Sequence, residues 1–136
     1  MQYLSFTDTR RRLRQVLDTA EAGLPIGIRR HDGLVALIES GRLREILMDS
    51  RRLRRPEAVA EAGGWSVFLH GTPVAADGAD LAEAVDEFVS ALREYADDWQ
   101  ARLRFAPNHQ HHWPLVQLVS LASDAELAEW VRGGGP

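Results

Sequence analysis

The residues of this sequence best suited to chemistry are arginines near its start. An arginine guanidinium stays charged and presents a planar fork of donors that fits phosphate and the edge of guanine. Six arginines crowd two short segments: Arg10, Arg11, Arg12 and Arg14, then Arg29 and Arg30. They predict a surface for a polyanion, which we expect to be DNA. The alternative is a solvated basic face without a ligand.

A helix over residues 7–22 would carry the first four arginines. Ser5 or Thr7 is a suitable N-cap, Gly23 a left-handed C-cap, and Pro25 prevents continuation. One buried face follows from the i, i+3, i+4, i+7 spacing of Leu13, Val16, Leu17 and Ala20. Cations near a helix N-terminus oppose the macrodipole by about 0.3–1 kcal/mol each, a cost that an anionic partner would offset.

A second candidate for chemistry is the histidine-rich segment Asn108–Pro114. Its histidines His109, His111 and His112 could supply zinc ligands, but no cysteine is present and no His-x-x-x-His spacing places two on one helix face. We therefore expect a loop between helices, with polar side chains capping helix ends and Trp113 in the core. No metal site is expected.

Motifs of catalysis are also missing from the sequence. No nucleophile lies in a recognisable elbow, no glycine-rich phosphate loop is present, and no acid pair has a motif around it. This pattern favours a binding protein over an enzyme and predicts no cofactor.

The composition is that of an ordinary globular protein, with 136 residues, 45% hydrophobic and 26% charged. This length predicts one domain or two small ones. No apolar run approaches a membrane span and no signal-peptide core is evident, so no membrane partner is expected. The absence of cysteine agrees with a cytoplasmic protein.

Charge divides the chain into a basic head and an acidic body. Residues 1–55 hold twelve arginines and seven acids, a net of +5, whereas residues 56–136 hold four arginines and thirteen acids, a net of −9. The head is thus expected to meet nucleic acid, and the body a different, basic partner.

Strands complete the head. Residues 2–5, 25–30 and 34–39 have strand patterns, and Asp32-Gly33 predicts a hairpin turn in which the glycine has a positive φ. Ser40 could cap a helix to about Met48, with Leu43, Ile46 and Leu47 inward. The basic run 51–55 is either the end of that helix or a linker, and it could also lie along a DNA backbone.

The body is expected to be mostly helical. Residues 57–64 form a short helix or a linker, residues 65–70 and 74–76 brief strands, and residues 80–105 a long amphipathic helix. Residues 115–121 are a helix with Pro114 at its start or a buried strand. Ser123 and Glu126 form a capping box for a last helix over 124–132, ended by three glycines.

The head resembles the prevent-host-death (Phd/YefM) antitoxin family. The resemblance covers about residues 1–50 and is carried by MQYLSF, Thr9-Arg10, EAGLPI, Ile28-Arg29-Arg30 and Ala36-Leu37-Ile38. It implies an α+β head with a three-stranded sheet that pairs as a homodimer on operator DNA. The DNA contacts it implies are Thr7, Thr9, Arg10, Arg11, Arg14, Arg29 and Arg30, with Arg10 and Arg30 as the principal ones.

Residues 64–99 resemble the HicB antitoxin module more weakly, through a strand, the turn PVAADG and the helix DLAEAVDEFVSALREY. That module carries partner recognition in its family. The partner contacts expected from this resemblance are Trp65, Phe68, Phe88, Leu92, Tyr95 and Trp99. The implied organisation is a head over 1–50, a linker over 51–64 and an acidic toxin- or partner-binding region over 65–136.

The sequence therefore predicts an α+β type II antitoxin that binds a toxin directly and represses its own operon as a dimer or higher homo-oligomer. The acidic body suggests an RNA-cleaving toxin with a basic surface, although a protein-modifying toxin is equally compatible. One alternative is a stand-alone dimeric repressor whose C-terminal region senses a ligand or oligomerises. Another is a metal enzyme built on the histidine loop.

Overall fold

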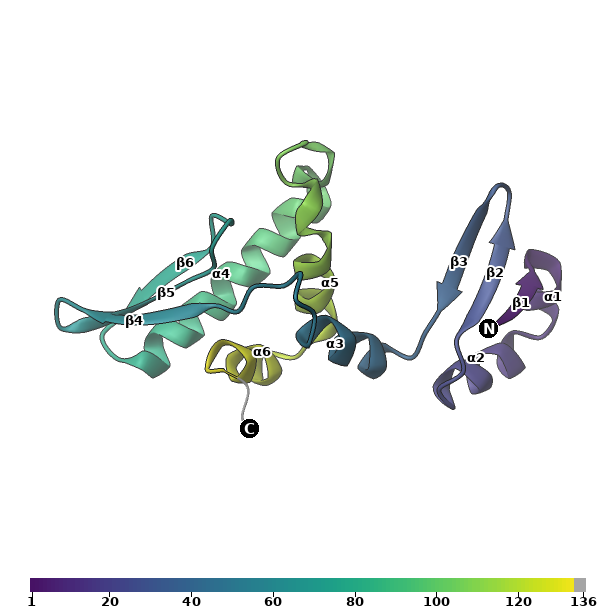
Figure 1. Ribbon diagram of the computed structural model, residues 1–136, viewed down its shortest axis with the longest axis horizontal. Helices are drawn as coiled ribbons and strands as arrows, with labels where there is room; N and C mark the ends of the chain where they lie inside the picture. Colours follow the sequence, from purple (N-terminus) through teal and green to yellow (C-terminus); the bar gives the residue numbers. More distant parts are fainter. Residues whose placement is uncertain (134–136) are drawn as a thin grey trace. The chain divides into compact units, whose positions relative to one another are not determined.

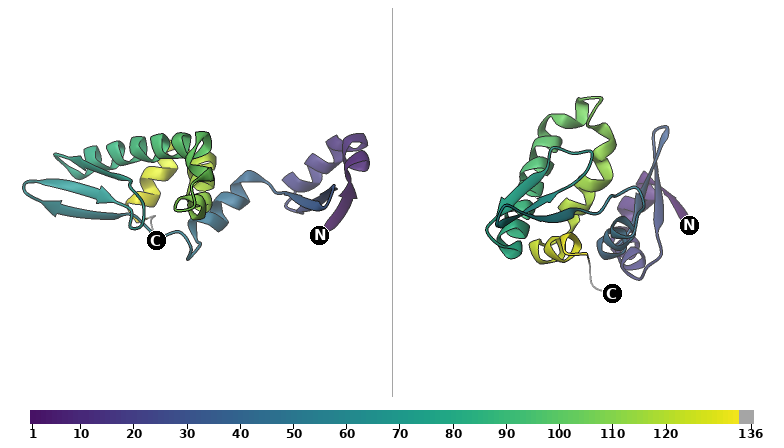
Figure 2. Two further views of the ribbon diagram at one scale, coloured as in Figure 1. Left: turned by 90° about the horizontal axis from the view of Figure 1, so that it is seen from above. Right: turned by 60° about the vertical axis from the view of Figure 1, so that its left-hand side comes forward.

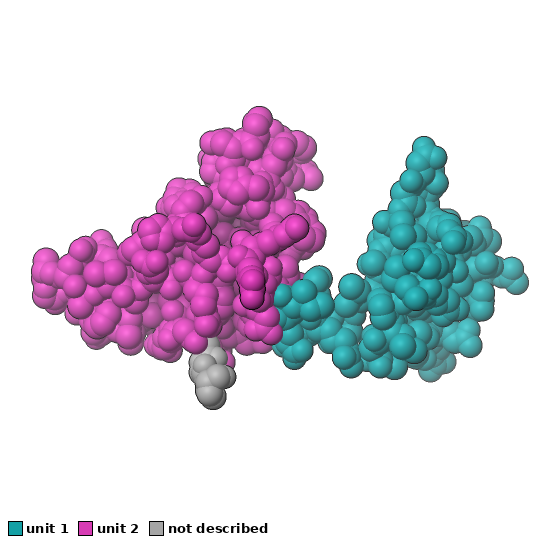
Figure 3. Space-filling view, in the orientation of Figure 1, with its two compact units in different colours: residues 1–46 teal, residues 47–136 magenta. Residues whose placement is uncertain are grey.

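The computed structural model describes residues 1–133. The chain divides into two compact units, residues 1–46 and residues 47–136 (Figure 3). Within the described residues there are two three-stranded sheets and six α-helices, and the region after the second sheet is helical (Figure 1). The predicted α+β class is confirmed.

The first unit is a small sheet packed against two helices. Strand β1 (Gln2–Ser5) runs parallel to β2 (Ile26–Arg30), and β3 (Gly33–Leu37) pairs with β2 in antiparallel fashion. Helices α1 (Phe6–Arg11) and α2 (Leu13–Glu21) both contact β2. The core is formed by the buried side chains of Leu4, Val16 and Ile26, with Ile28 and Leu37 packed against them.

The single helix predicted over residues 7–22 is in fact two helices, because Arg12 adopts a non-helical conformation (φ −119°, ψ 32°). Arg10 and Arg11 consequently lie in the last turn of α1, where cations are favoured by the macrodipole. Contrary to the expectation, these two arginines therefore do not oppose the macrodipole. The expectation still applies to Arg14, which lies in the first turn of α2.

The ends of these elements follow local rules with two exceptions. Ser5 caps α1, its hydroxyl accepting from the Asp8 amide at 3.1 Å, and Gly23 (φ 99°) ends α2 as predicted. In the β2–β3 turn, however, the positive φ belongs to His31 (49°) and not to Gly33. Glu39, not Ser40, caps the next helix.

Helix α3 (Ser40–Met48) begins at the Glu39 carboxylate, which accepts from the amides of Gly41 and Arg42 at 3.0 and 2.9 Å. These two bonds hold the pKa of Glu39 below its usual value. Leu47 is buried as expected, but Ile46 is exposed.

The second unit begins with an antiparallel meander. Strand β4 (Glu57–Glu61) pairs with β5 (Gly64–Phe68), which pairs with β6 (Ala75–Gly78). The expectation of a short helix or linker over residues 57–64 was therefore wrong. Ala62 and Gly63 make the tight turn between β4 and β5, both with positive φ (48° and 81°), as in a type I′ hairpin.

Helix α4 (Leu81–Ala101) covers one face of this sheet and contacts β5 and β6 (Figure 2). Asp80 caps it by accepting from the Glu83 amide at 2.8 Å. The helix ends at Ala101, four residues earlier than predicted, and the chain continues into a 3₁₀ turn, η1 (Leu103–Phe105). Its inner face carries the buried stripe expected from the sequence.

Two further helices complete the unit. A second 3₁₀ turn, η2 (Gln110–His112), leads into α5 (Trp113–Leu121), so the helical alternative for this apolar run was correct. Both halves of the predicted capping box are present at the start of α6 (Asp124–Val131). Trp113 was expected in the core but is about half exposed. Of the three glycines, only Gly133 lies among the described residues.

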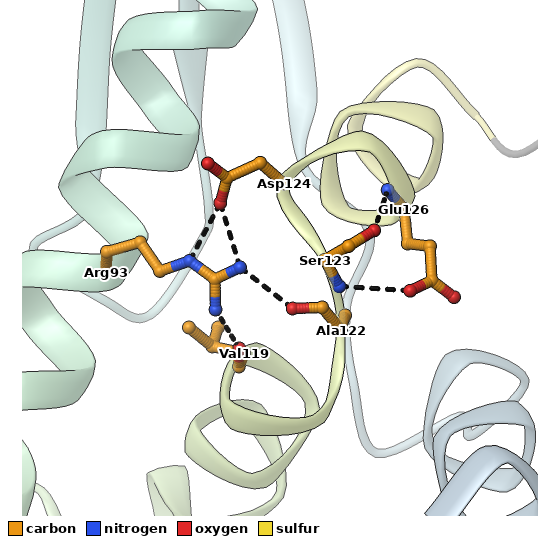
Figure 4. A network of polar contacts seen from close by, with 6 residues as sticks. All are labelled: Arg93, Val119, Ala122, Ser123, Asp124 and Glu126. Atoms are coloured by element: carbon orange, nitrogen blue, oxygen red, sulfur yellow. Dashed lines mark hydrogen bonds and ion pairs between the residues drawn. The ribbon is translucent and has the colours of Figure 1, made fainter.

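Arg93 joins α4 to the other two helices (Figure 4). Its guanidinium donates to the backbone carbonyls of Val119 and Ala122 at the end of α5, the latter at 2.8 Å. It also donates to the Asp124 carboxylate at the start of α6, at 2.8 and 3.0 Å. One side chain thus caps α5 and pairs with α6.

No helix within residues 1–133 is long and apolar enough to cross a bilayer.

Candidate functional site

Of the two arginines expected to be principal DNA contacts, Arg30 lies over an aromatic ring of the first unit, and Arg10 lies on the same helix as that aromatic residue. The Arg30 guanidinium lies over the Phe6 ring, 5.0 Å from its centroid. Arg10 is four residues after Phe6 on α1, so the two side chains share a helix face. We call Phe6, Arg10 and Arg30 the Phe6 cluster. All three are exposed, so the cluster presents two cations to solvent from different elements.

Arg29 does not join this cluster. Successive residues of a strand point to opposite faces of the sheet, so Arg29 and Arg30 diverge. Arg29 instead lies over Tyr3, 5.2 Å from the ring centroid, on the face away from α1 and α2. Tyr3 closes over Gly27, where a Cβ would come within 2.8 Å of the tyrosine ring. Arg29 therefore belongs to a separate, partly aromatic surface.

The remaining residues expected to contact DNA differ in their exposure to solvent. Thr7, Arg11 and Arg14 are exposed. Thr9 is buried, and its hydroxyl donates to the Ser5 carbonyl at 2.8 Å, so it supports α1 and has no free donor. Its expected role as a DNA contact is replaced by a structural one.

None of the six arginines makes an ion pair with any residue in the described part of the chain. In the second unit, by contrast, Arg93 pairs with Asp124 and Arg102 with Asp98, at 2.8 and 2.6 Å. The first unit thus keeps its positive charge uncompensated at the Phe6 cluster and along α1 and α2. Such a surface attracts phosphate through charge and forked donors.

Most of the expected partner contacts are core residues. Phe88 and Leu92 are fully buried, and Tyr95 and Trp99 are only 7% exposed. They hold α4 against the sheet and the following helices, so they cannot contact a partner without opening the unit. Trp65 and Phe68 are half-buried. The expected partner site is therefore corrected for the four α4 residues.

The sheet face opposite α4 is open and acidic. By strand register, Phe68 shares this face with Glu57, and Ser66 shares it with Val59 and Asp77. The Ser66 hydroxyl lies 3.0 Å from the Glu61 carboxylate and 2.5 Å from that of Asp77. We call this the outer sheet face; its members are Glu57, Val59, Glu61, Ser66, Phe68 and Asp77.

Strand β4 forms one edge of this sheet. Within the described residues it pairs with β5 alone, so its other edge leaves backbone donors and acceptors unpaired. Every residue of β4 is exposed. An extended segment of another chain could extend the sheet there.

The histidines form a hydrogen-bonded network in place of a metal site. His112 Nε2 is 3.0 Å from the Gly71 carbonyl and must donate to it, so neutral Nδ1 accepts from the Tyr95 hydroxyl at 2.5 Å. Tyr95 then accepts from His109 Nδ1 at 2.9 Å. Trp99 Nε1 donates to the His109 carbonyl at 2.8 Å. No group of three acidic or histidine side chains within residues 1–133 could hold a metal ion.

The surroundings of His112 favour its neutral form. Burial lowers the pKa of His112, and the neighbouring His111 lowers it further, against the opposing effect of the bond to Gly71. Burial, followed by the charge of Asp98, raises the pKa of Tyr95. Both groups therefore stay uncharged at neutral pH and act as hydrogen-bonding core residues.

Sequence reasoning missed the aromatic partners Phe6 and Tyr3. Each lies beside an arginine only because β1 pairs in parallel with β2 and α1 follows β1 directly. The exposed aromatic at position 6, one residue before the predicted helix, was the available signal.

Comparison with known proteins gives the class of the chain. Residues 1–131 match the family described as PHD_like, antitoxins of RelE/RelB toxin–antitoxin systems, and the chain belongs to this family. A crystal structure of an antitoxin from Syntrophomonas wolfei subsp. wolfei shares the fold, with a TM-score of 0.80, 22% identity and 96% of each chain covered. No curated protein matches the chain. Family membership implies a cognate toxin as partner.

Proposed function

We propose that this antitoxin neutralises its toxin by direct binding and represses its own operon by binding operator DNA as a homodimer, in the cytoplasm. The observation that carries the DNA-binding half is the Phe6 cluster, in which the exposed Arg30 lies over the Phe6 ring, the exposed Arg10 shares a helix face with Phe6, and neither arginine has a carboxylate partner within the described residues. The Phd/YefM resemblance of residues 1–50 supports the same assignment. Dimerisation and DNA binding would belong to this head.

We expect the arginines of the head to differ in what they contact, some reaching base edges and others phosphates. Arg30 is braced by the Phe6 ring, which reduces the entropy lost when its fork engages a base edge. Arg10, on the same helix face as Phe6, would reach the same groove. Arg11 and Arg14 are exposed farther along and suit phosphate contacts, which set affinity and salt dependence.

Dimerisation is supported by the incomplete burial of α2. Of the apolar stripe predicted from spacing, Val16 and Ala20 are buried, but Leu13 and Leu17 remain 51% and 41% exposed. A second copy that covers these leucines would add apolar burial that the small head lacks. A two-fold dimer would also present two Phe6 clusters to two half-sites of a palindrome.

We assign toxin binding to the outer sheet face and the free edge of β4, in place of the buried α4 residues. The face combines the apolar side chains of Val59 and Phe68 with the carboxylates of Glu57, Glu61 and Asp77. Such a face suits a basic protein, such as an RNA-cleaving toxin with a positively charged substrate surface. The acidic partner region would then begin with β4, ahead of Trp65.

Fluorescence anisotropy with the promoter fragment upstream of the gene tests the DNA-binding half. We expect sequence-specific, salt-sensitive binding, and a cost of about 1–3 kcal/mol for Arg10→Ala if this arginine contacts a base. Arg104→Ala is the matched control, because Arg104 is an exposed arginine of the second unit, outside the proposed DNA-binding head. Equal operator affinity of wild type and Arg10→Ala would refute the assignment.

A further inference from the structure

A pocket in the second unit is basic although the unit as a whole is acidic. It has a volume of about 410 Å³ and lies between the turn at residues 52–54, the end of β5 with its following turn, and the start of α5. We call it the Arg52–Arg54 pocket. Its ionisable lining residues are Arg52, Arg54, His70, His111 and His112, and no carboxylate lines it.

Local structure holds the two arginines at this pocket. The Ser50 hydroxyl accepts from the Arg52 amide at 3.2 Å, and the Ser50 carbonyl accepts from the Leu53 amide at the same distance. Leu53 is buried, so its side chain anchors the turn, and both neighbouring arginines line the pocket. Neither arginine forms an ion pair within the described part of the chain.

The inner wall of the pocket is apolar. It is built by the buried side chains of Leu53, Leu69 and Leu115, together with Pro114. A ligand that fits this arrangement has a compact organic body against the leucines and an anionic group between the guanidinium forks. The volume lies within the range of small-molecule sites.

The histidines of the pocket have different roles. His112 has both ring nitrogens engaged, with Gly71 and Tyr95, so it shapes the wall and is not a free donor. His70 lies 3.3 Å from the Glu57 carboxylate. His111 is exposed, its ring 4.0 Å from that of His112, and it remains available to donate to an anion.

We propose that the Arg52–Arg54 pocket binds a small phosphate-bearing ligand, with Arg52, Arg54 and His111 as its donors. A phosphate monoester carries close to two negative charges at neutral pH, which two guanidinium groups neutralise, and its oxygens accept from planar forks. The pocket shares no residue with the Phe6 cluster. It would therefore allow a small ligand to bind in the unit to which we assign toxin binding, separately from DNA.

The test is an NMR titration of the full chain, which follows the backbone amides of Gly71, Thr72 and His111. The probes are phenyl phosphate, inorganic phosphate, phenol and an oligonucleotide without a terminal phosphate. The variant is the double substitution Arg52→Gln and Arg54→Gln. The matched control is Arg51→Gln with Arg55→Gln, which removes the same charge from the same segment but from residues that do not line this pocket.

We expect saturable shifts with phenyl phosphate, none with phenol, and affinity at least tenfold weaker in the Arg52/Arg54 variant but not in the control. Tighter binding of phenyl phosphate than of inorganic phosphate would identify an organic monoester as the ligand, and equal binding would identify free phosphate. Three results would overturn the proposal: no saturable shift at millimolar phosphate, equal loss in both double variants, or binding of the oligonucleotide alone. Thermal unfolding of each variant verifies its fold.

Discussion

Arg93 offers the most quantitative test of how the second unit holds together. Its guanidinium is the donor to two carbonyls at the end of α5, those of Val119 and Ala122, and to the carboxylate of Asp124. Arg93→Met keeps the length and the apolar stem of the side chain but removes all four hydrogen bonds to these three residues. The two carbonyls belong to buried residues, and an unsatisfied buried acceptor costs about 1–3 kcal/mol.

The expected loss is smaller than the sum of these contributions. The Arg93 side chain is 35% exposed, so water can partly replace it at the carbonyls. The Asp124 side chain is 78% exposed, and the ion pair itself contributes only about 0–1 kcal/mol. We therefore predict that Arg93→Met lowers the free energy of unfolding by ~2–3 kcal/mol, and that Asp124→Asn lowers it by at most ~1 kcal/mol.

Urea unfolding followed by tryptophan fluorescence measures both variants. All four tryptophans, at positions 65, 99, 113 and 130, lie in the second unit, so the signal reports that unit alone. Similar losses for Arg93→Met and Asp124→Asn would refute the reasoning, since they would reduce the network to a surface ion pair.

Three further predictions concern pH, assembly and the partner. The folded-state pKa of His112 is below the ordinary value of 6.5, so the folded chain binds this proton less readily than the unfolded chain. Stability should thus be full above pH 6.5 and fall as the pH drops below it, whereas His112→Gln should flatten this dependence in thermal unfolding. Leu17→Glu should convert a dimer into a monomer in analytical ultracentrifugation, whereas Glu21→Gln, at an exposed polar position of the same helix, should not; a dimeric Leu17→Glu chain would place the interface elsewhere. Phe68→Glu should weaken capture of the toxin at least tenfold if the outer sheet face is its site, and unchanged capture by a folded variant would exclude that face.

The sequence was most informative where local rules act alone. The strand over residues 2–5, the glycine end at Gly23 and the capping box at Ser123 are each determined by a few adjacent residues, and the structure has all three. The break at Arg12 was not predictable in this way. The apolar stripe continues across Arg12, so the periodicity favours one helix. The division into two helices is seen only in the fold, where α1 and α2 both pack against the small sheet.

Strand β4 was missed because its turn lacks the usual signal. A type I′ hairpin normally has asparagine, aspartate or glycine at its first central position, and here that position is Ala62 (φ 48°). An alanine-rich segment ending in two glycines was therefore interpreted as a helix or linker. The turn is held by the pairing of β4 with β5, which single-residue propensity does not reveal.

For the candidate sites too, the sequence indicated the residue types but not their neighbours in the fold. Arginine clustering identified the basic surface, but strand alternation separates Arg29 from Arg30, and only the fold brings Arg30 to Phe6. An apolar helix stripe predicts burial without indicating what covers it. For α4 the cover is the unit's own sheet and helices, so Phe88, Leu92, Tyr95 and Trp99 were assigned to a partner when they form the core.

Co-expression with the protein encoded by the adjacent reading frame tests the central claim most directly. If the chain is an antitoxin that acts by direct binding, it should restore growth to cells that express this neighbour and should co-purify with it. The double variant Arg10→Ala with Arg30→Ala should restore growth equally well, because we assign the Phe6 cluster to DNA and the outer sheet face to the toxin. Failure of the folded wild-type chain to restore growth or to co-purify would contradict the account.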